Sequence, residues 1–266
     1  MGSCKQCVAG CDPAAEQAQW VPLSLGRDPI IALAGNPNTG KSTIFNHLTG
    51  LRQHTGNWPG KTVSRAEGTF THAGRPFTLV DLPGTYSLTA DSTDEEIARD
   101  FVLFERPDCT VVVCDATVLE RNLLLVLQML EITDRVVLCL NLMDEADRKQ
   151  IALEARLLEK ELGVPVVPTV ARRGQGLEVL VRTIAEVAMG RRATDPKRVR
   201  LDEPFEAAIA ELGEALLALL PNVACPRWIA LRLLEGDRHI EQALLGGQLA
   251  DLFGAEGRNQ ANEAAA

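Results

Sequence analysis

A glycine-rich segment, GNPNTGKST at residues 35–43, carries the residue types and spacing best suited to chemistry. It matches the pattern GxxxxGK[ST] and lies between an apolar run typical of a strand and a pattern typical of a helix. In that context, backbone N–H groups of the loop and of the helix N-terminus bind phosphate oxygens. Lys41 would contact the β- and γ-phosphates, and the Ser42 hydroxyl would bind Mg²⁺. The loop residues expected to bind a nucleotide are Gly35, Asn36, Pro37, Asn38, Thr39, Gly40, Lys41, Ser42 and Thr43.

A second motif, DLPG at residues 81–84, follows another apolar run. Asp81 fits the strand-end carboxylate that holds Mg²⁺, often through a water molecule. The Gly84 amide would contact the γ-phosphate, and Thr62, which lies between the two motifs, could bind Mg²⁺ in the triphosphate state. These positions predict phosphoryl chemistry with Lys41, Thr62 and Gly84 in catalytic roles.

The third motif, NLMD at residues 141–144, ends a further apolar run and matches NxxD with leucine in the usual lysine position. The carboxylate of Asp144 can accept both the N1–H and the N2 amino hydrogens of guanine, and adenine presents no such pair. GTP is therefore favoured over ATP. In the later segment VARRGQG, the backbone of Ala171 would donate to the guanine oxygen. Asn141 and Asp144 are therefore expected to bind GTP. The alternative interpretation of NLMD is a strand-end turn with an Asx cap on the next helix.

Thr85 follows Gly84 at the position where Ras-type switches place a water-orienting glutamine. Its short side chain cannot reach as far as a glutamine. We therefore expect slow basal hydrolysis, with the attacking water oriented by backbone groups of residues 53–62 and 83–94, the two segments expected to move with the nucleotide.

Short β-rich runs alternate with amphipathic segments in the first two thirds of the chain, which predicts a mostly parallel sheet covered on both faces, an α/β P-loop GTPase fold. Ligands bind such sheets at the carboxyl ends of the strands, where the three motifs lie. Strands are predicted at 30–34, 77–81, 110–115, 136–141 and 164–167, and helices at 42–49, 95–104, 119–131, 151–162 and 177–189.

The character of the sequence changes after Gly190. RRATDPKRVR is polar, basic and interrupted by Pro196, so it predicts a solvated linker, with binding to anionic lipid head groups as the alternative. Beyond it, only helical spacing is found, at 203–220, 226–234 and 238–253, which predicts a small all-helical domain. The expected divisions are a tail at 1–27, a nucleotide-binding domain at 28–190, a linker at 191–200 and a helical domain at 201–266.

The composition narrows the function classes. With 27 basic and 36 acidic residues, the chain of 266 residues has a net charge of −9, which disfavours nonspecific nucleic-acid binding. Its apolar runs fall short of the roughly 18 residues that span a bilayer, and its N-terminus lacks an apolar signal core, so a cytoplasmic, reducing compartment is expected. Cys109, Cys114 and Cys139 should then be buried thiols.

The tail segment CKQCVAGC places Cys4, Cys7 and Cys11 close together, where thiolates could bind Zn²⁺ or iron. A closed tetrahedral site needs four ligands, so Asp12 or a partner chain would have to supply the fourth. A metal sensor that reports to the nucleotide-binding domain is one hypothesis, and a disordered appendage is the alternative.

Several motifs together carry a family resemblance. GNPNTGKSTIFNHLTG, TGNWPGKTVSRAEG, DLPGTYSLTADSTDEEIARD, DATVLERNLLLVLQMLE and NLMD resemble the cytosolic G domain of ferrous iron transport protein B, and RWIALRLLEGD at 227–237 resembles that family's helical domain. The resemblance implies a GTPase on the cytoplasmic side of the bacterial inner membrane that regulates Fe²⁺ uptake. It also implies as partners the transporter's own membrane domain, which this sequence does not include, small cytosolic Feo proteins and further copies of the chain.

The same resemblance implies stimulation by K⁺. Asn38 matches the asparagine that binds the ion and so joins the expected catalytic residues, while backbone carbonyls around Gly56 and Trp58 would complete the site. An RNA- or ribosome-associated GTPase of the Era or TrmE type is the alternative, because it shares these motifs, although its basic RNA-binding module is not found in this sequence.

Overall fold

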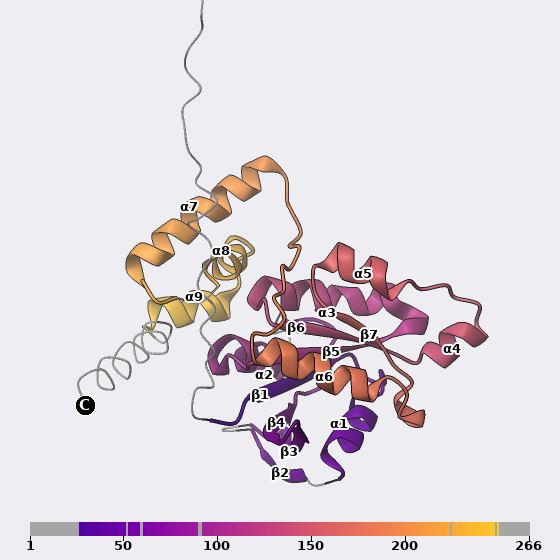
Figure 1. The fold of residues 1–266 in the computed structure, drawn as a ribbon. Helices are drawn as coiled ribbons and strands as arrows, with labels where there is room; N and C mark the ends of the chain where they lie inside the picture. Colours follow the sequence, from indigo (N-terminus) through magenta and orange to yellow (C-terminus); the bar gives the residue numbers. More distant parts are fainter. Residues whose placement is uncertain are drawn as a thin grey trace, which may run out of the picture.

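A seven-stranded sheet forms the centre of the molecule (Figure 1). The structure is a computed structural model, and it describes residues 27–249 apart from 52, 59, 60, 90, 91, 224 and 248. The strand order is β2-β3-β4-β1-β5-β6-β7. Strands β4, β1, β5, β6 and β7 are parallel, while β2 and β3 extend the sheet as an antiparallel edge. The strands are β1 (Ile30–Gly35), β2 (Gln53–Asn57), β3 (Ser64–His72), β4 (Arg75–Asp81), β5 (Cys109–Asp115), β6 (Val136–Asn141) and β7 (Val166–Pro168).

Helices cover both faces of this sheet, as the alternating pattern predicts (Figure 1). Side chains of β5 alternate between the two cores: Val111 packs with α1 and α6 on one face, and Val112 packs with α3 on the other. The helices of this domain are α1 (Lys41–Thr49), α2 (Thr93–Asp100), α3 (Leu119–Ile132), α4 (Met143–Arg148), α5 (Ala155–Leu162) and α6 (Leu177–Ala188). Short helices lie at η1 (Phe101–Glu105), η2 (Ala116–Val118) and η3 (Ala171–Arg173).

The three cysteines expected in the core are buried there, which confirms that prediction. Burial raises the pKa of the Cys139 thiol to about 12, and it also raises the pKa values of Cys109 and Cys114 well above their usual range. These thiols therefore stay protonated near neutral pH and pack as small apolar side chains.

A helical unit follows, formed by α7 (Glu203–Leu219), α8 (Pro226–Leu234) and α9 (Arg238–Leu245) (Figure 1). It is joined to the sheet domain by polar contacts from α8 to α3. Arg227 Nε lies 3.2 Å from Glu131, and Cys225 Sγ donates to the Ile132 carbonyl at 2.6 Å. The helical unit is thus packed on the face of the sheet that α3 covers.

The segment at 191–200, predicted to be a solvated linker, has no helix or strand, is largely exposed and also contacts the sheet domain. Arg192 pairs with Glu159 at 2.5 Å, and Arg198 pairs with Asp134 at 2.5 Å. The Asp195 N–H also donates to the Gly163 carbonyl at 2.9 Å. Because these arginines have acidic partners on the protein, they are less available to anionic lipid than the sequence alone suggests.

Gly163, at the end of α5, gives a test of this packing. Its φ is +72°, and an added Cβ would lie 1.8 Å from the Asp195 carbonyl oxygen. We expect Gly163→Ala to lower the free energy of unfolding by about 2–4 kcal/mol, measured by urea denaturation. The matched control is Gly74→Ala, which has a φ of +79° with nothing within 4 Å of the added Cβ, so only conformational strain of about 1 kcal/mol applies. Equal losses in the two variants would show that 191–200 does not pack on α5 in solution.

Candidate functional site

The loop between β1 and α1 has a backbone that glycine alone fits at two positions. Gly35 has a φ of +154°, and an added Cβ would lie 2.5 Å from the Val113 carbonyl oxygen. Gly40 has a φ of +89°, and its added Cβ would lie 2.3 Å from Asn141 Nδ2. The loop is therefore held close to the ends of β5 and β6, at the carboxyl edge of the parallel strands.

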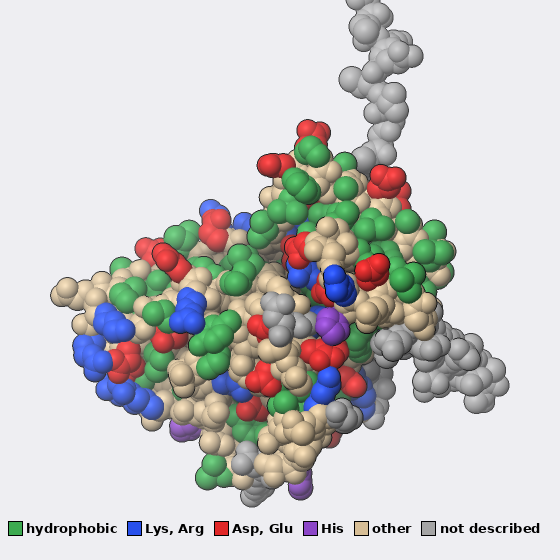
Figure 2. Space-filling view, turned by 180° about the vertical axis from the view of Figure 1, so that it is seen from behind, with side chains coloured by type: hydrophobic (Ala, Val, Ile, Leu, Met, Phe, Trp, Pro, Cys, Tyr) green, Lys and Arg blue, Asp and Glu red, His purple; other side chains and the backbone are tan. Residues whose placement is uncertain are grey.

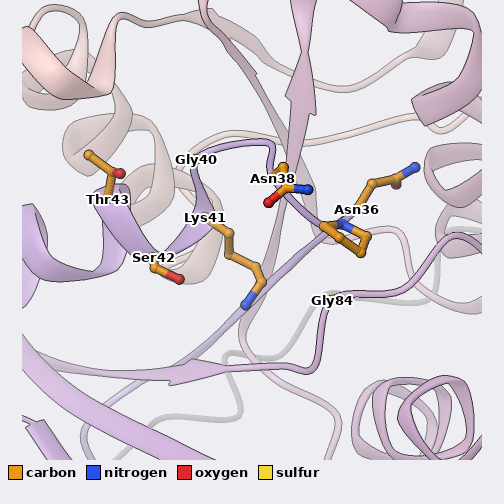
Figure 3. Close-up of a pocket in the computed structure, with 8 residues that line it drawn as sticks. Asn36, Asn38, Gly40, Lys41, Ser42, Thr43 and Gly84 are labelled. Atoms are coloured by element: carbon orange, nitrogen blue, oxygen red, sulfur yellow. The ribbon is translucent and has the colours of Figure 1, made fainter.

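A cavity of about 430 Å³ opens over this loop (Figure 3). Figure 3 shows Lys41 and Ser42 at the start of α1, with the Lys41 side chain extended toward the segment that carries Gly84. The Asn36 carboxamide points away from Lys41, is buried, and has no hydrogen-bond partner among the described residues. The lining residues are Asn36, Pro37, Asn38, Gly40, Lys41, Ser42, Thr43 and Gly84, all of them predicted from the motifs.

Lys41, which lines this cavity, forms an ion pair with Asp81. Burial raises the pKa of the Asp81 carboxyl, although the Lys41 ammonium opposes that rise. The Ser42 hydroxyl and the Asp81 carboxylate are hard oxygen donors of the kind that Mg²⁺ prefers, and Mg²⁺ sites commonly use one or two such groups with substrate phosphates. The described residues contain no cluster of three or more His, Cys, Asp or Glu side chains placed to hold a metal without such phosphates.

The segment after Asp81 is docked on the phosphate loop. The Thr85 N–H donates to the Gly35 carbonyl at 3.3 Å, and an added Cβ on Gly84 would lie 3.5 Å from Pro37. Thr85 is only 3% exposed, and its hydroxyl donates to the Ser87 carbonyl at 2.7 Å. That hydroxyl is therefore occupied in holding the loop, which fits the expectation that it does not replace a glutamine.

The first segment expected to move with the nucleotide, residues 53–62, includes β2 at the sheet edge, and none of its described residues lines the cavity. Gly56 pairs with Arg65 in the β2–β3 ladder, and Trp58 is buried against Phe101 with ring centroids 5.5 Å apart. The Trp58 carbonyl accepts from the Lys61 N–H at 3.0 Å, and Thr62 is exposed in the bend before β3. The structure thus keeps Gly56, Trp58 and Thr62 apart from the other predicted site residues.

Asn141 connects the phosphate loop to the other side of the site. Its Nδ2 donates to the Thr39 carbonyl at 2.9 Å, and its Oδ1 accepts from the Thr169 hydroxyl at 3.1 Å and from the Ala171 N–H at 3.0 Å. The side chain is 1% exposed. The Ala171 amide, expected to meet a guanine oxygen, is therefore already bonded to Asn141.

Asp144 lies in the first turn of α4 and is paired with arginines of η3, which follows β7. Arg172 Nε donates to Asp144 Oδ2 at 3.1 Å, a second Arg172 nitrogen contacts the same oxygen, and Arg173 Nη2 lies 3.7 Å from it. Sequence reasoning missed Arg172 as a site residue, because nothing in the spacing of VARRGQG connects it to a carboxylate 28 positions away. The predicted metal-binding cysteines Cys4, Cys7 and Cys11 lie outside the described residues.

Comparison with known proteins gives consistent matches along the chain. Residues 29–184 match a family model described as ferrous iron transport protein B, and residues 202–264 match one described as FeoB cytosolic helical domain. The Fe(2+) transporter FeoB of Salmonella choleraesuis is 42% identical over 213 residues, which cover 78% of this chain and 27% of that protein. The chain thus spans only a minor part of the curated relatives that it matches.

Solved structures agree with this assignment. The cytosolic domain of the T. maritima FeoB iron transporter in a GDP form has a TM-score of 0.76 and 38% identity, covering 85% of this chain and 86% of that chain. The same domain in a GMPPNP form has a TM-score of 0.74 and 39% identity, covering 84% and 86%. Within the described residues, every helix is too short or too polar to cross a bilayer. The P-loop GTPase fold and both family matches lead to one conclusion, that this chain belongs to the ferrous iron transport protein B family.

Proposed function

We propose that the chain binds GTP and hydrolyses it to GDP and phosphate as the nucleotide-dependent part of an Fe²⁺ transporter. The observation that carries this proposal is Asn141, whose carboxamide joins the phosphate loop at Thr39 to the loop at Ala171. A nucleotide that lies along this line would place its phosphates at Lys41 and its base at Asp144. The T. maritima domain, which has GDP and GMPPNP forms, supports the proposal of nucleotide binding.

At the phosphate end, Lys41 would leave Asp81 and contact the β- and γ-phosphates. Ser42 and Asp81 are the residues that would hold Mg²⁺, and the ion would supply neutralisation of phosphate charge. The phosphate contacts are assigned to backbone N–H groups of Gly35, Asn36, Asn38, Thr39, Gly40, Lys41, Ser42 and Thr43, while Pro37, which has no N–H, shapes the loop. The Gly84 amide would meet the γ-phosphate.

Hydrolysis requires Trp58 and Thr62, in the first segment expected to move with the nucleotide, to leave their observed positions. Lys61 Nζ contacts Glu96 on α2 at 2.9 Å, so this ion pair and the Trp58 packing hold Thr62 away from the phosphates. Closure would bring Thr62 to Mg²⁺ and the carbonyls at Gly56 and Trp58 to Asn38. Those groups would hold K⁺, which would supply the positive charge that an arginine finger provides elsewhere.

The same elements give a route toward a membrane partner. Helix α2 also carries Arg99, and its Nη1 lies 4.0 Å from Asp237, the residue that caps α9 of the helical unit. Movement of α2 with the nucleotide would therefore alter the helical unit. We assign the membrane domain of the same transporter, on the cytoplasmic side of the bacterial inner membrane, as the partner that receives this change, with Fe²⁺ as the cargo. Small cytosolic Feo proteins and further copies of the chain are additional candidate partners.

The test is phosphate release measured with GTP or ATP, in KCl or NaCl, in parallel. We expect hydrolysis with GTP only, slow in NaCl and about tenfold faster in KCl, because a cation at Asn38 would replace part of an effect worth about 10³–10⁵ when an arginine supplies it. Asn38→Ala should bind GDP normally and give the same slow rate in both salts.

Two results would contradict these assignments separately. Equal hydrolysis of GTP and ATP would remove the guanine preference, and equal GTP hydrolysis in KCl and NaCl by the unaltered chain would remove the K⁺ site. Because both family matches concern FeoB, the RNA- or ribosome-associated alternative is not proposed.

A further inference from the structure

The carboxylate expected to recognise guanine is held by the protein's own arginine. Arg172 donates to Asp144 Oδ2 through Nε at 3.1 Å and through Nη2, so its guanidinium makes two contacts to one oxygen. The other oxygen, Asp144 Oδ1, is buried and has no hydrogen-bond partner among the described residues. Neither oxygen is therefore open to the N1–H and N2 amino groups of a base.

The remaining base-recognition groups are bonded in the same way. Asn141 Oδ1 accepts from both Thr169 and Ala171, so the Ala171 amide is directed into the protein and away from a base. A bridge between Val170 and Gln175 closes the loop backbone that carries Arg172. Among the polar groups of Asn141, Asp144 and the Ala171 amide that are assigned to the base, Asp144 Oδ1 therefore stands apart, because it has no hydrogen-bond partner in the described part of the chain.

We propose that Arg172 is an intramolecular competitor of guanine for Asp144. This inference rests on the proposed GTP-binding function and adds a regulatory step to it. The Arg172 latch, meaning the contact of its guanidinium with Asp144, must open before the base can bind, and it closes again when the base leaves. Only the fraction of molecules with an open latch is competent to bind, and that fraction lowers the apparent affinity.

Two features make the latch reversible. The Arg172 side chain is 52% exposed, so water screens the ion pair and can solvate the guanidinium when it leaves. Glu145 Oε1 lies 3.2 Å from Arg172 Nη2, so the released guanidinium keeps an acidic neighbour. When guanine binds after the latch opens, it supplies Asp144 Oδ1 with the hydrogen-bond donor that this oxygen lacks, which favours exchange of the arginine for guanine.

The first experiment compares the affinity and dissociation rate of fluorescently labelled GDP for the unaltered chain, Arg172→Ala and Arg148→Ala. Arg148→Ala is the matched control, because it removes the same charge and Arg148 also contacts Glu145, on helix α4. We expect Arg172→Ala to bind GDP about two- to fivefold more tightly, the range that an exposed ion pair supplies. Arg148→Ala should leave the affinity unchanged. Weaker GDP binding by Arg172→Ala would mean that the arginine orients Asp144 for guanine, and it would overturn the proposal, as would no change.

A second experiment shows whether the effect passes through Asp144. In an Asp144→Asn background, measured with xanthosine diphosphate, adding Arg172→Ala should change the affinity little, because the charge-assisted contact is already lost. A similar tightening in that background would overturn the latch. If the unaltered chain bound no GDP, the proposed function would fail with it, whereas GDP binding that Arg172→Ala does not tighten would overturn the latch alone.

Discussion

Asp144→Asn is expected to weaken GDP binding by about 10²–10⁴-fold and to favour xanthosine diphosphate instead. Two hydrogen bonds from guanine to a carboxylate are worth about 1.5–3 kcal/mol each, which sets that range. An asparagine side chain has one acceptor, its oxygen, and one donor group, its NH₂. The oxygen can still accept from N1–H, but the NH₂ would face the N2 amino group of guanine, which is also a donor. In xanthine a carbonyl replaces that amino group and can accept from the NH₂. Competition between labelled GDP and each unlabelled nucleotide measures the change.

The control for that variant is Asp147→Asn, at an exposed position near the end of the same helix α4. It removes the same charge from α4 without touching the residues assigned to the base. GDP affinity should stay within about twofold of the unaltered chain, since surface changes of this kind have small effects. If both variants lost GDP affinity equally, charge near α4 would be the cause, and recognition by Asp144 would be wrong.

The elements that carry the motifs could be predicted because each has a strong local pattern. The apolar strand β6 and the helix at 226–234 have the bounds that the sequence predicts. Prediction failed where tertiary packing decides the backbone. Strands β2 and β3 are not among the strands predicted from the sequence. The β3 segment, SRAEGTFTH, alternates only weakly between apolar and polar residues and pairs at a partly exposed edge of the sheet.

Helix boundaries show the same limit. The helix predicted at 151–162 begins only at Ala155, and residues 151–154 are not helical. The helix predicted at 95–104 divides into α2 and the π-helical turn η1, where Phe101 packs on Trp58. Side-chain contacts between distant segments, such as Arg172 with Asp144, leave no periodic trace and could be found only in the structure.

The clearest test of the phosphate end is Lys41→Ala. We expect it to lower the rate of GTP hydrolysis by about 10²–10³-fold, the usual cost of removing one group that stabilises developing charge. GDP should also bind more weakly, because the β-phosphate loses its ammonium partner. Phosphate release and labelled-GDP titration give the two values, and Lys160→Ala serves as a control because Lys160 is exposed on α5, outside the residues assigned to the nucleotide.

Lys41→Ala should also change how stability depends on pH, and this effect needs no nucleotide. Burial raises the pKa of Asp81, and Lys41 is the group that opposes the rise, so the variant leaves the carboxyl with a still higher pKa. An acid whose folded pKa is raised opposes folding while it is ionised, and the loss is recovered as pH falls through that pKa. The stability gap between Lys41→Ala and the unaltered chain should therefore narrow as pH is lowered from 7 toward 3.8, the ordinary value for this carboxyl. In an Asp81→Asn background, the stability gap caused by Lys41→Ala should not change with pH. A gap that stayed constant with pH when Asp81 is present would mean that Lys41 and Asp81 are not paired in solution.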